Sequence, residues 1–278
     1  MLVLIGLYAF GNVQSQSVKD NYNGVQDIDT AKFRRRATPL PYIREADVMW
    51  SKRLWRVMDL REKVNQPFYY PTTKLLERES LFDVLKDAIA AGQLTAYDNP
   101  LFDDEFKQEM SSSTFSNLIV KWDTTNMMPD PDNPDKLVRT KTKTEITSEN
   151  VKQYLIKEDW FFDKQRSVME VRIIGICPLV EDFTESGEFR GYKRLFWIYF
   201  PDARHVLAKH YAFIRGNYSS PLTFDDLFLK RMFSSQIVKE SNVFDRSISE
   251  YANGLDILLE ADRIKNDINI YENDMWHY

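Results

Sequence analysis

The sequence is poor in the residues that build metal sites, disulfides and repeats. Its 278 residues include one cysteine, three histidines and nine glycines. A single cysteine excludes a disulfide-stapled scaffold, and so few glycines argue against a repeat architecture. Positive charge is also scarce, since 37 Lys and Arg face 42 Asp and Glu and leave a net charge of −5. Because binding to nucleic acid requires a basic face, we do not expect a nucleic-acid partner.

Motifs for catalysis and metal binding are missing as well. The sequence contains no HExxH, no glycine-rich phosphate loop and no GxSxG. His205 and His210 are five positions apart, which places them on different faces of a helix rather than at the spacing of a metal-binding pair. Asp130 and Asp132 resemble the start of an EF-hand loop, but the glycine of that loop is absent and Lys141 stands where its closing glutamate belongs. We therefore predict no metal and no cofactor.

The best acid–base candidates are Glu158, Asp159 and Asp163, which surround a Trp-Phe-Phe run. Carboxylates beside aromatic residues also occur where a turn is fixed between two elements, and no base or metal ligand accompanies these three. Cys177 lies within an apolar strand, so we interpret it as part of the core rather than as a nucleophile. The sequence favours a protein without catalytic residues.

The chain begins with an apolar run, Leu2–Phe10, that is roughly half the length of a membrane span. Small and polar residues follow it. This pattern predicts a signal peptide over residues 1–17 with cleavage near Ser15–Ser17, although no basic n-region precedes Leu2. An ordinary buried strand is the alternative. No cysteine stands just after the apolar run, so we expect no lipid anchor, and the run is too short for a direct membrane span.

Residues 18–42 are polar and predict an extended N-terminal arm. The arm contains Arg34, Arg35 and Arg36, followed by Thr-Pro-Leu-Pro-Tyr. These arginines are either solvated charge or a docking site for an acidic surface of a partner protein. They are candidate partner-binding residues on the second interpretation.

Residues 43–278 predict one domain, which opens with a helix over residues 43–70. Apolar residues recur every three or four positions from Ala46 to Val64, the period of a helix with one buried face. Trp55 falls on the opposite, charged face beside Arg56. A tryptophan there meets either a second layer of its own fold or another protein. We expect another protein, so Trp55 and Arg56 are also candidate partner-binding residues.

Capping patterns predict further helices that begin at Ser80, Thr223 and Ser247. Strands are expected within residues 157–179 and 195–200, and the second is apolar on both faces and therefore central in its sheet. The last helix carries two apolar stripes, which indicates wide contact with the fold or with a neighbouring protein. Together these patterns predict an α+β fold, a small and mostly antiparallel sheet enclosed by helices with a helical N-terminal part.

Five segments, in order along the chain, resemble one family. They are IREADVMWSKRLWRVMDLREKVNQPFYY at 43–70, KEDWFFD at 157–163, RIIGI at 172–176, NVFDRSISEY at 242–251 and ENDMW at 272–276. Together they cover about residues 40–278. They resemble the gliding-motility GldN / PorN family of the Bacteroidetes type IX secretion system.

The resemblance implies a periplasmic protein without enzymatic activity that is peripherally associated with the outer membrane. It implies a large ring formed with an outer-membrane lipoprotein, GldK / PorK, and contact with the periplasmic part of the motor protein GldM / PorM. In this family the system exports proteins that carry a C-terminal signal.

The residues alone also allow a different class of function, a periplasmic ligand- or glycan-binding domain. Its stacking platforms would be Trp50, Trp55, Trp160 and Trp197. Sugar platforms are exposed and coplanar around a cleft, whereas tryptophans that serve assembly are scattered over different faces.

Overall fold

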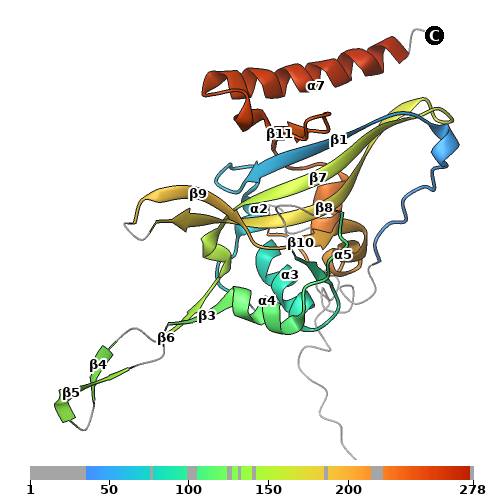
Figure 1. Ribbon diagram of the computed structural model, residues 1–278. Helices are drawn as coiled ribbons and strands as arrows, with labels where there is room; N and C mark the ends of the chain where they lie inside the picture. The colour runs from blue at the N-terminus through green and yellow to red at the C-terminus, as the bar shows by residue number, and fades with distance from the viewer. Residues whose placement is uncertain are drawn as a thin grey trace, which may run out of the picture. The chain divides into compact units, whose positions relative to one another are not determined.

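Two long strands form the centre of the structure. The structure is a computed structural model, and it describes residues 36–75, 78–98, 105–123, 127–130, 133–139, 142–184, 187–213 and 222–275. β7 (Val151–Asp163) and β8 (Val168–Phe183) pair antiparallel along most of their length. Figure 1 shows them crossing the molecule side by side. The predicted signal peptide, residues 1–17, lies outside the described residues, as does the predicted arm before Arg36.

The main sheet of the described chain has seven strands in the order β11–β1–β7–β8–β10–β2, with β9 paired to β8. All of these pairs are antiparallel, which confirms the predicted sheet type. The other strands are β1 (Val48–Asp59), β2 (Ala96–Tyr97), β9 (Phe189–Arg194), β10 (Trp197–Tyr199) and β11 (Gln236–Glu240). Separate two-stranded sheets are formed by β3 (Val120–Asp123) with β6 (Thr142–Glu145) and by β4 (Met127–Asp130) with β5 (Asn133–Arg139).

Helices lie before, between and after these strands, so the fold is α+β as predicted. The α-helices are α2 (Gln66–Tyr69), α3 (Leu81–Ala90), α4 (Ser112–Ile119), α5 (Phe200–Leu207), α6 (Phe224–Leu229) and α7 (Leu255–Met275). Short 3-10 helices are η2 (Glu45–Asp47), η3 (Ser148–Asn150) and η4 (Ile248–Glu250).

The predicted opening helix is wrong, because Val48–Asp59 form strand β1 between β7 and β11. Leu54 and Met58 share one face of this strand and are completely buried. Trp55 and Val57 share the other face and pack into a separate cluster. A strand covered on both faces carries apolar side chains at neighbouring positions, which imitates the three-to-four-residue spacing of a helix. Of the predicted helical N-terminal part, residues 43–70 contain only η2 and the single turn of α2, whereas the helix expected after Ser80 is present as α3.

The capping patterns correctly predict where local structure begins. Ser80 accepts a hydrogen bond from the backbone N–H of Asp83 at the start of α3, and Thr223 forms a reciprocal box with Asp226 at the start of α6. The box that begins at Ser247 is also present. It opens η4 rather than the last helix, since α7 begins at Leu255.

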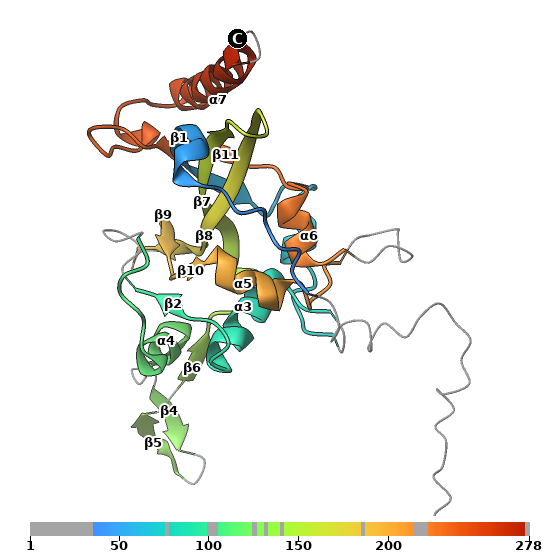
Figure 2. The same cartoon turned by 90° about the vertical axis from the view of Figure 1, so that its right-hand side faces the viewer.

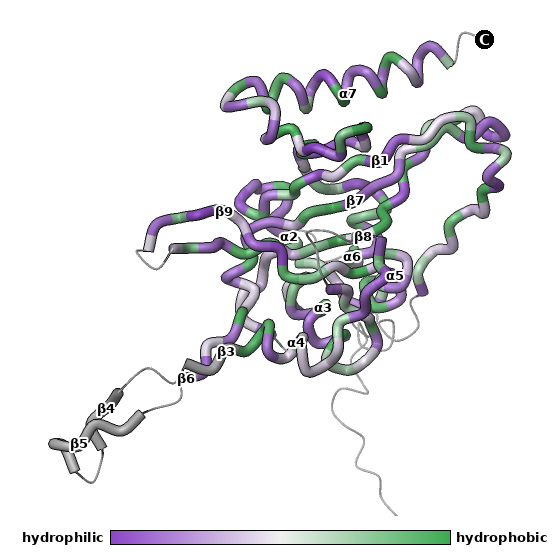
Figure 3. The backbone as a smooth tube through the Cα atoms, in the orientation of Figure 1, coloured by the Kyte–Doolittle hydropathy of each residue, from purple (hydrophilic) through white to green (hydrophobic). Residues whose placement is uncertain are grey.

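Three apolar clusters cover the two faces of the sheet. The largest joins strand residues to helices α2–α6, and its members include Met58, Tyr154, Ile156, Ile176, Phe68, Phe82, Leu85 and Phe228. A second lies beneath α7 and contains Leu54, Ile237, Ala261, Ile264 and Ile268. The third contains Trp55, Leu155, Cys177, Leu179 and Trp197. Figure 3 shows the resulting apolar stretches along β7 and β8.

Candidate functional site

The three acid–base candidates lie on β7, and each forms an ion pair with a different arginine. Glu158 is completely buried. Its carboxylate accepts hydrogen bonds from Nη1 and Nη2 of Arg231 at 3.0 and 3.2 Å and from Nε1 of Trp160 at 3.1 Å. Arg231 in turn lies over the Trp160 ring, 5.5 Å from its centroid. Because both oxygens of Glu158 are engaged by donors, this carboxylate is built into the packing between β7 and the segment after α6.

The other two carboxylates are held in the same manner. Asp159 forms a two-point ion pair with Arg53 of β1, with N–O distances of 2.6 and 2.8 Å. Asp163 accepts from the backbone N–H of Gln165 and from Nε of Arg166, which fixes the turn between β7 and β8. The hydrogen bond from Arg166 is the main reason that the pKa of Asp163 lies below its ordinary value. All three carboxylates therefore stabilise the fold.

The indole of Trp55 lies between two lysines from the neighbouring strands. Trp55 pairs with Lys239 of β11 on one side and with Lys157 of β7 on the other. The Nζ atoms of these lysines lie 4.5 and 5.7 Å from the Trp55 ring centroid. The side chain is only 7% exposed. Its own sheet therefore covers Trp55, which is the alternative to the contact with another protein that we expected.

The remaining candidate partner-binding residues differ in position. Arg56 donates from Nε to the hydroxyl of Ser235 at 2.8 Å and from Nη2 to its carbonyl oxygen at 2.9 Å. Burial lowers the pKa of Arg56 from its ordinary value. Arg36 is exposed, whereas Arg34 and Arg35 lie outside the described residues. Of this set, only Arg36 is seen on the surface.

The structure gives a reason for the glycine of the RIIGI segment, Gly175, which the sequence alone does not give. Gly175 pairs with Lys157 of β7, and a Cβ atom at this position would overlap the ring of Phe106 and approach the carbonyl oxygen of Ile198 to 3.3 Å. The Phe106 ring therefore lies directly over the strand, 5.6 Å from Nζ of the buried Lys157 and edge-on to Trp197. Glycine is required here by the close approach of an aromatic ring.

Cys177 is completely buried, as predicted. Burial raises the pKa of its thiol to about 12. A thiol with so high a pKa is protonated at neutral pH and is a poor nucleophile. Across the described parts of the chain, no group of three or more His, Cys, Asp or Glu side chains could hold a metal ion. In the same parts no helix is both long and apolar enough to cross a bilayer.

The model of one protein family, described as "Gliding motility associated protein GldN", matches residues 43–277. The chain belongs to the GldN family. It is therefore a component of the gliding-motility and type IX secretion machinery, as the resemblance implies. A comparison with curated protein sequences gives no match.

The GldN-family segments found in the sequence meet in the structure. The opening run, KEDWFFD and RIIGI lie on the neighbouring strands β1, β7 and β8. In the NVFDR segment, Oδ1 of Asn242 accepts from the backbone N–H groups of Phe244 and Arg246, and Asp245 forms an ion pair with Lys239. This places the loop beside the lysine that covers Trp55. Of the last segment, ENDMW, residues 272–275 complete α7 and Trp276 lies outside the described residues.

The four tryptophans proposed as sugar-stacking platforms, all of which lie in described parts of this GldN-family chain, do not form such platforms. Trp55 and Trp197 are buried. Trp50 stacks on Tyr271 of α7 at a centroid distance of 4.8 Å, and Trp160 is covered by Arg231. None of the four is exposed. The glycan-binding alternative therefore loses the platforms on which it depended.

The last helix has the first of its two predicted stripes, but Ile248 and Tyr251 of the second stripe precede α7, and only Leu255 and Leu258 lie on it. Ala261, Ile264 and Ile268 are buried against the sheet. On the second stripe, Leu255 and Leu258 are 68% and 49% exposed. Leu259 of the same helix and Val243 and Phe244 of the loop before η4 are also exposed. The chain thus carries apolar side chains on the surface along the first turns of α7 and in the loop before it.

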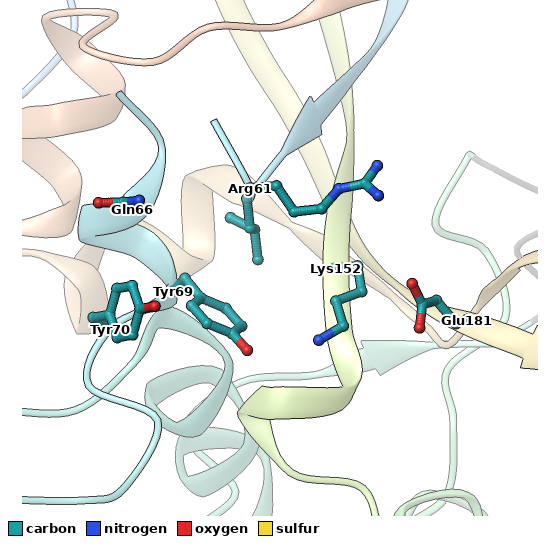
Figure 4. Close-up of a pocket in the computed structure, with 7 residues that line it drawn as sticks. Arg61, Gln66, Tyr69, Tyr70, Lys152 and Glu181 are labelled. Atoms are coloured by element: carbon teal, nitrogen blue, oxygen red, sulfur yellow. The ribbon is translucent and has the colours of Figure 1, made fainter. Parts of the chain in front are cut away.

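A pocket of about 300 Å³ at the end of β1 was not predicted from the sequence. Figure 4 shows its lining, which includes Arg61, Gln66, Tyr69, Lys152 and Glu181. Lys152 of β7 lies over the Tyr69 ring, and Arg61 is paired with Asp59 at the end of β1. This ion pair holds the pKa of Asp59 at about 2. Lys152 and Glu181 lie about 80 to 120 positions beyond the other lining residues in the sequence, so no local motif could reveal the pocket.

Proposed function

We propose that this GldN-family chain is a non-enzymatic structural component of the type IX secretion machinery. The buried carboxylate of Glu158, saturated by Arg231 and Trp160, supports a structural rather than a chemical role for the KEDWFFD segment. The chain resides in the periplasm and associates peripherally with the outer membrane. It forms a ring with a GldK/PorK-like lipoprotein, in which copies of this chain contact either one another or the lipoprotein. It also contacts a GldM/PorM-like motor protein.

The observation that carries this proposal is the exposed apolar surface of α7. Leu255, Leu258 and Leu259 lie on the outside of a helix whose opposite face is already packed. Exposed leucines in a contiguous group are typical of surfaces that become buried in an assembly. We propose that this surface contacts the lipoprotein or a ring neighbour. We also propose that the arm contacts an acidic surface of a partner through Arg34–Arg36.

Co-expression with the lipoprotein, followed by purification and measurement of the mass of the complex, tests the proposal. We expect a complex much larger than a one-to-one pair. Leu258→Glu is expected to reduce complex formation at least tenfold, because the charge would be buried without a partner. Glu272→Gln, a change on α7 far from the leucines, is the matched control and should assemble normally. A mixture that remains as separate monomers contradicts the proposal.

A further inference from the structure

β8 has an open edge along its first seven residues. β7 pairs with β8 from Val168 to Val180 on one side. On the other side, β10 pairs only at Gly175 and Ile176, and β9 only from Leu179 onward. Within the described chain, residues 168–174 therefore have no strand partner on this side. The backbone N–H and C=O groups of this edge that point away from β7 are available for another strand.

A groove of about 560 Å³ runs along this open edge. One wall is β8 from Met169 to Ile174, and the facing walls come from the start of α5 and the end of α6. Apolar side chains dominate the helical walls, namely Phe200, Pro201, Phe228 and Leu229. A groove between a free strand edge and a helix is the geometry in which extended peptides bind by adding a strand.

The charged residues of the groove are already neutralised by the fold. Arg204 forms a buried two-point ion pair with Asp225, at 2.8 and 3.2 Å, and Arg231 is held by Glu158. The other charged lining residues, Glu170 and Arg172, pair with each other, and Glu170 also pairs with Arg166. The groove therefore offers backbone hydrogen bonds and apolar contact rather than net charge. A ligand with uncharged apolar side chains fits it better than an acidic or basic one.

A segment of the N-terminal arm, which we call the strap (Thr38–Pro41), lies over this groove. Nη2 of Arg204 donates to the carbonyl oxygen of Thr38, and Nη2 of Arg172 donates to that of Pro41, both at 2.6 Å. Leu40 lines the groove and is 41% exposed. Figure 2 shows the arm passing from the start of β1 toward α5 and α6.

The strap does not complete the sheet. Pro39 and Pro41 have no N–H group, so neither can donate to β8. No backbone hydrogen bond joins the strap to residues 168–174 within the described chain. Two arginine side chains and one half-exposed leucine hold it in place. Proline-containing covers of this kind protect a strand edge from unwanted pairing.

We propose that residues 168–174 of β8 bind an extended apolar segment of a partner protein by strand addition, and that this segment displaces Leu40 from the groove. The free edge supplies the hydrogen bonds, Leu40 marks the position of an apolar side chain, and the weakly held strap is the part that moves. The inference goes beyond the proposed ring assembly and is tested without it, so either can fail alone.

Binding of a labelled peptide to the whole chain tests the proposal. The probe is a fluorescein-labelled nine-residue peptide of alternating threonine and valine, followed by fluorescence anisotropy. Leu40→Ser is expected to bind it at least tenfold more tightly than the unaltered chain, because the groove no longer has to be vacated. A version of the peptide that is N-methylated at alternate residues keeps the side chains but loses N–H donors, and it should bind Leu40→Ser at least tenfold more weakly.

A pair of matched leucines controls for non-specific binding. Leu229→Glu, at the groove, combined with Leu40→Ser should abolish binding of the peptide, whereas Leu258→Glu, on the exposed stripe of α7, should leave it unchanged. Failure of the labelled peptide to bind Leu40→Ser when the protein is in 100-fold excess over the peptide overturns the proposal. The proposal is also overturned if the N-methylated peptide binds Leu40→Ser as tightly as the unmodified peptide does. The same holds if Leu258→Glu weakens peptide binding as much as Leu229→Glu does.

Discussion

Glu158 and Arg231 form an ion pair in which the Glu158 side chain is completely buried and the Arg231 side chain is one-third exposed. The pair joins the centre of the sheet to the second residue after α6, 73 positions later in the sequence. Trp160 donates to the same carboxylate and packs under the same guanidinium. The three residues act as one packing unit.

Glu158→Gln should therefore destabilise the protein by about 2–3 kcal/mol, measured by urea unfolding. Removal of one member of a buried ion pair costs about 3–5 kcal/mol, and the partial exposure of Arg231 reduces that cost. Asp159→Asn is the matched control, since Asp159 and its partner Arg53 are 28% and 39% exposed and the pair contributes under about 1 kcal/mol. Equal costs for the two substitutions would contradict this assignment.

Trp55→Ala should destabilise the isolated protein by about 3–5 kcal/mol, because a buried indole and its contacts with two lysines are lost. Thermal melts of the protein without any partner measure the effect. Val243→Ala, at a side chain that is 97% exposed, should melt as the unaltered protein does. A Trp55→Ala protein that melts normally but loses its binding partner would restore Trp55 as an interface residue.

Gly175→Ala should cost roughly 1–3 kcal/mol in free energy of unfolding, since the added methyl group overlaps the ring of Phe106. Phe106→Ala removes that ring. We expect the double substitution to cost less than the sum of the two single ones, and urea unfolding of all three variants gives the coupling. Additive costs would show that the close approach of Phe106 does not explain the glycine.

The pKa of Asp59, held at about 2 chiefly by hydrogen bonds from Arg61, makes this ion pair dependent on pH. Its ordinary value is 3.8. Because the pKa is lowered on folding, the pair adds stability that is complete above pH 3.8 and is lost as the pH falls through about 2. NMR titration of the Asp59 carboxyl carbon should give this value, and Arg61→Gln should return the pKa toward 3.8. No change in Arg61→Gln would contradict the assigned cause.

The mature protein should begin between Ser15 and Lys19 if residues 1–17 are a signal peptide. N-terminal sequencing of protein recovered from the periplasm gives the answer. Protein that still carries Leu2 would refute the prediction. Replacement of Ile5 and Leu7 by Asp should keep the chain unprocessed, because the apolar run would be interrupted.

Local signals in the sequence were sufficient for some parts of this fold. Ser80 and Thr223 are followed by residues that complete a helix cap within three positions, so each start could be predicted without tertiary information. The stripe of Ala261, Ile264 and Ile268 was predictable for the same reason, because one helix face meets one sheet.

β1 could not be assigned in this way. Leu54 is buried by β11 and α7, and Trp55 is covered by lysines of β7 and β11, all of which lie about 100 to 200 positions away in the sequence. The same distance hid the pocket beside Arg61 and the groove beneath Leu40, since each joins segments that share no local pattern. Residues whose surroundings come from remote strands are misread when only neighbours in sequence are considered.

The position of β1 also sets the order in which the sheet is completed during synthesis. Arg56 on β1 and Ser235 beside β11 are bonded across 179 positions. In a nascent chain β1 therefore has no neighbouring strand until β7 has been made. Its other edge stays unpaired until β11 has been made, when nearly the whole protein has emerged. Closing so long a loop is slow, so the chain depends on late contacts and is exposed to aggregation until they form.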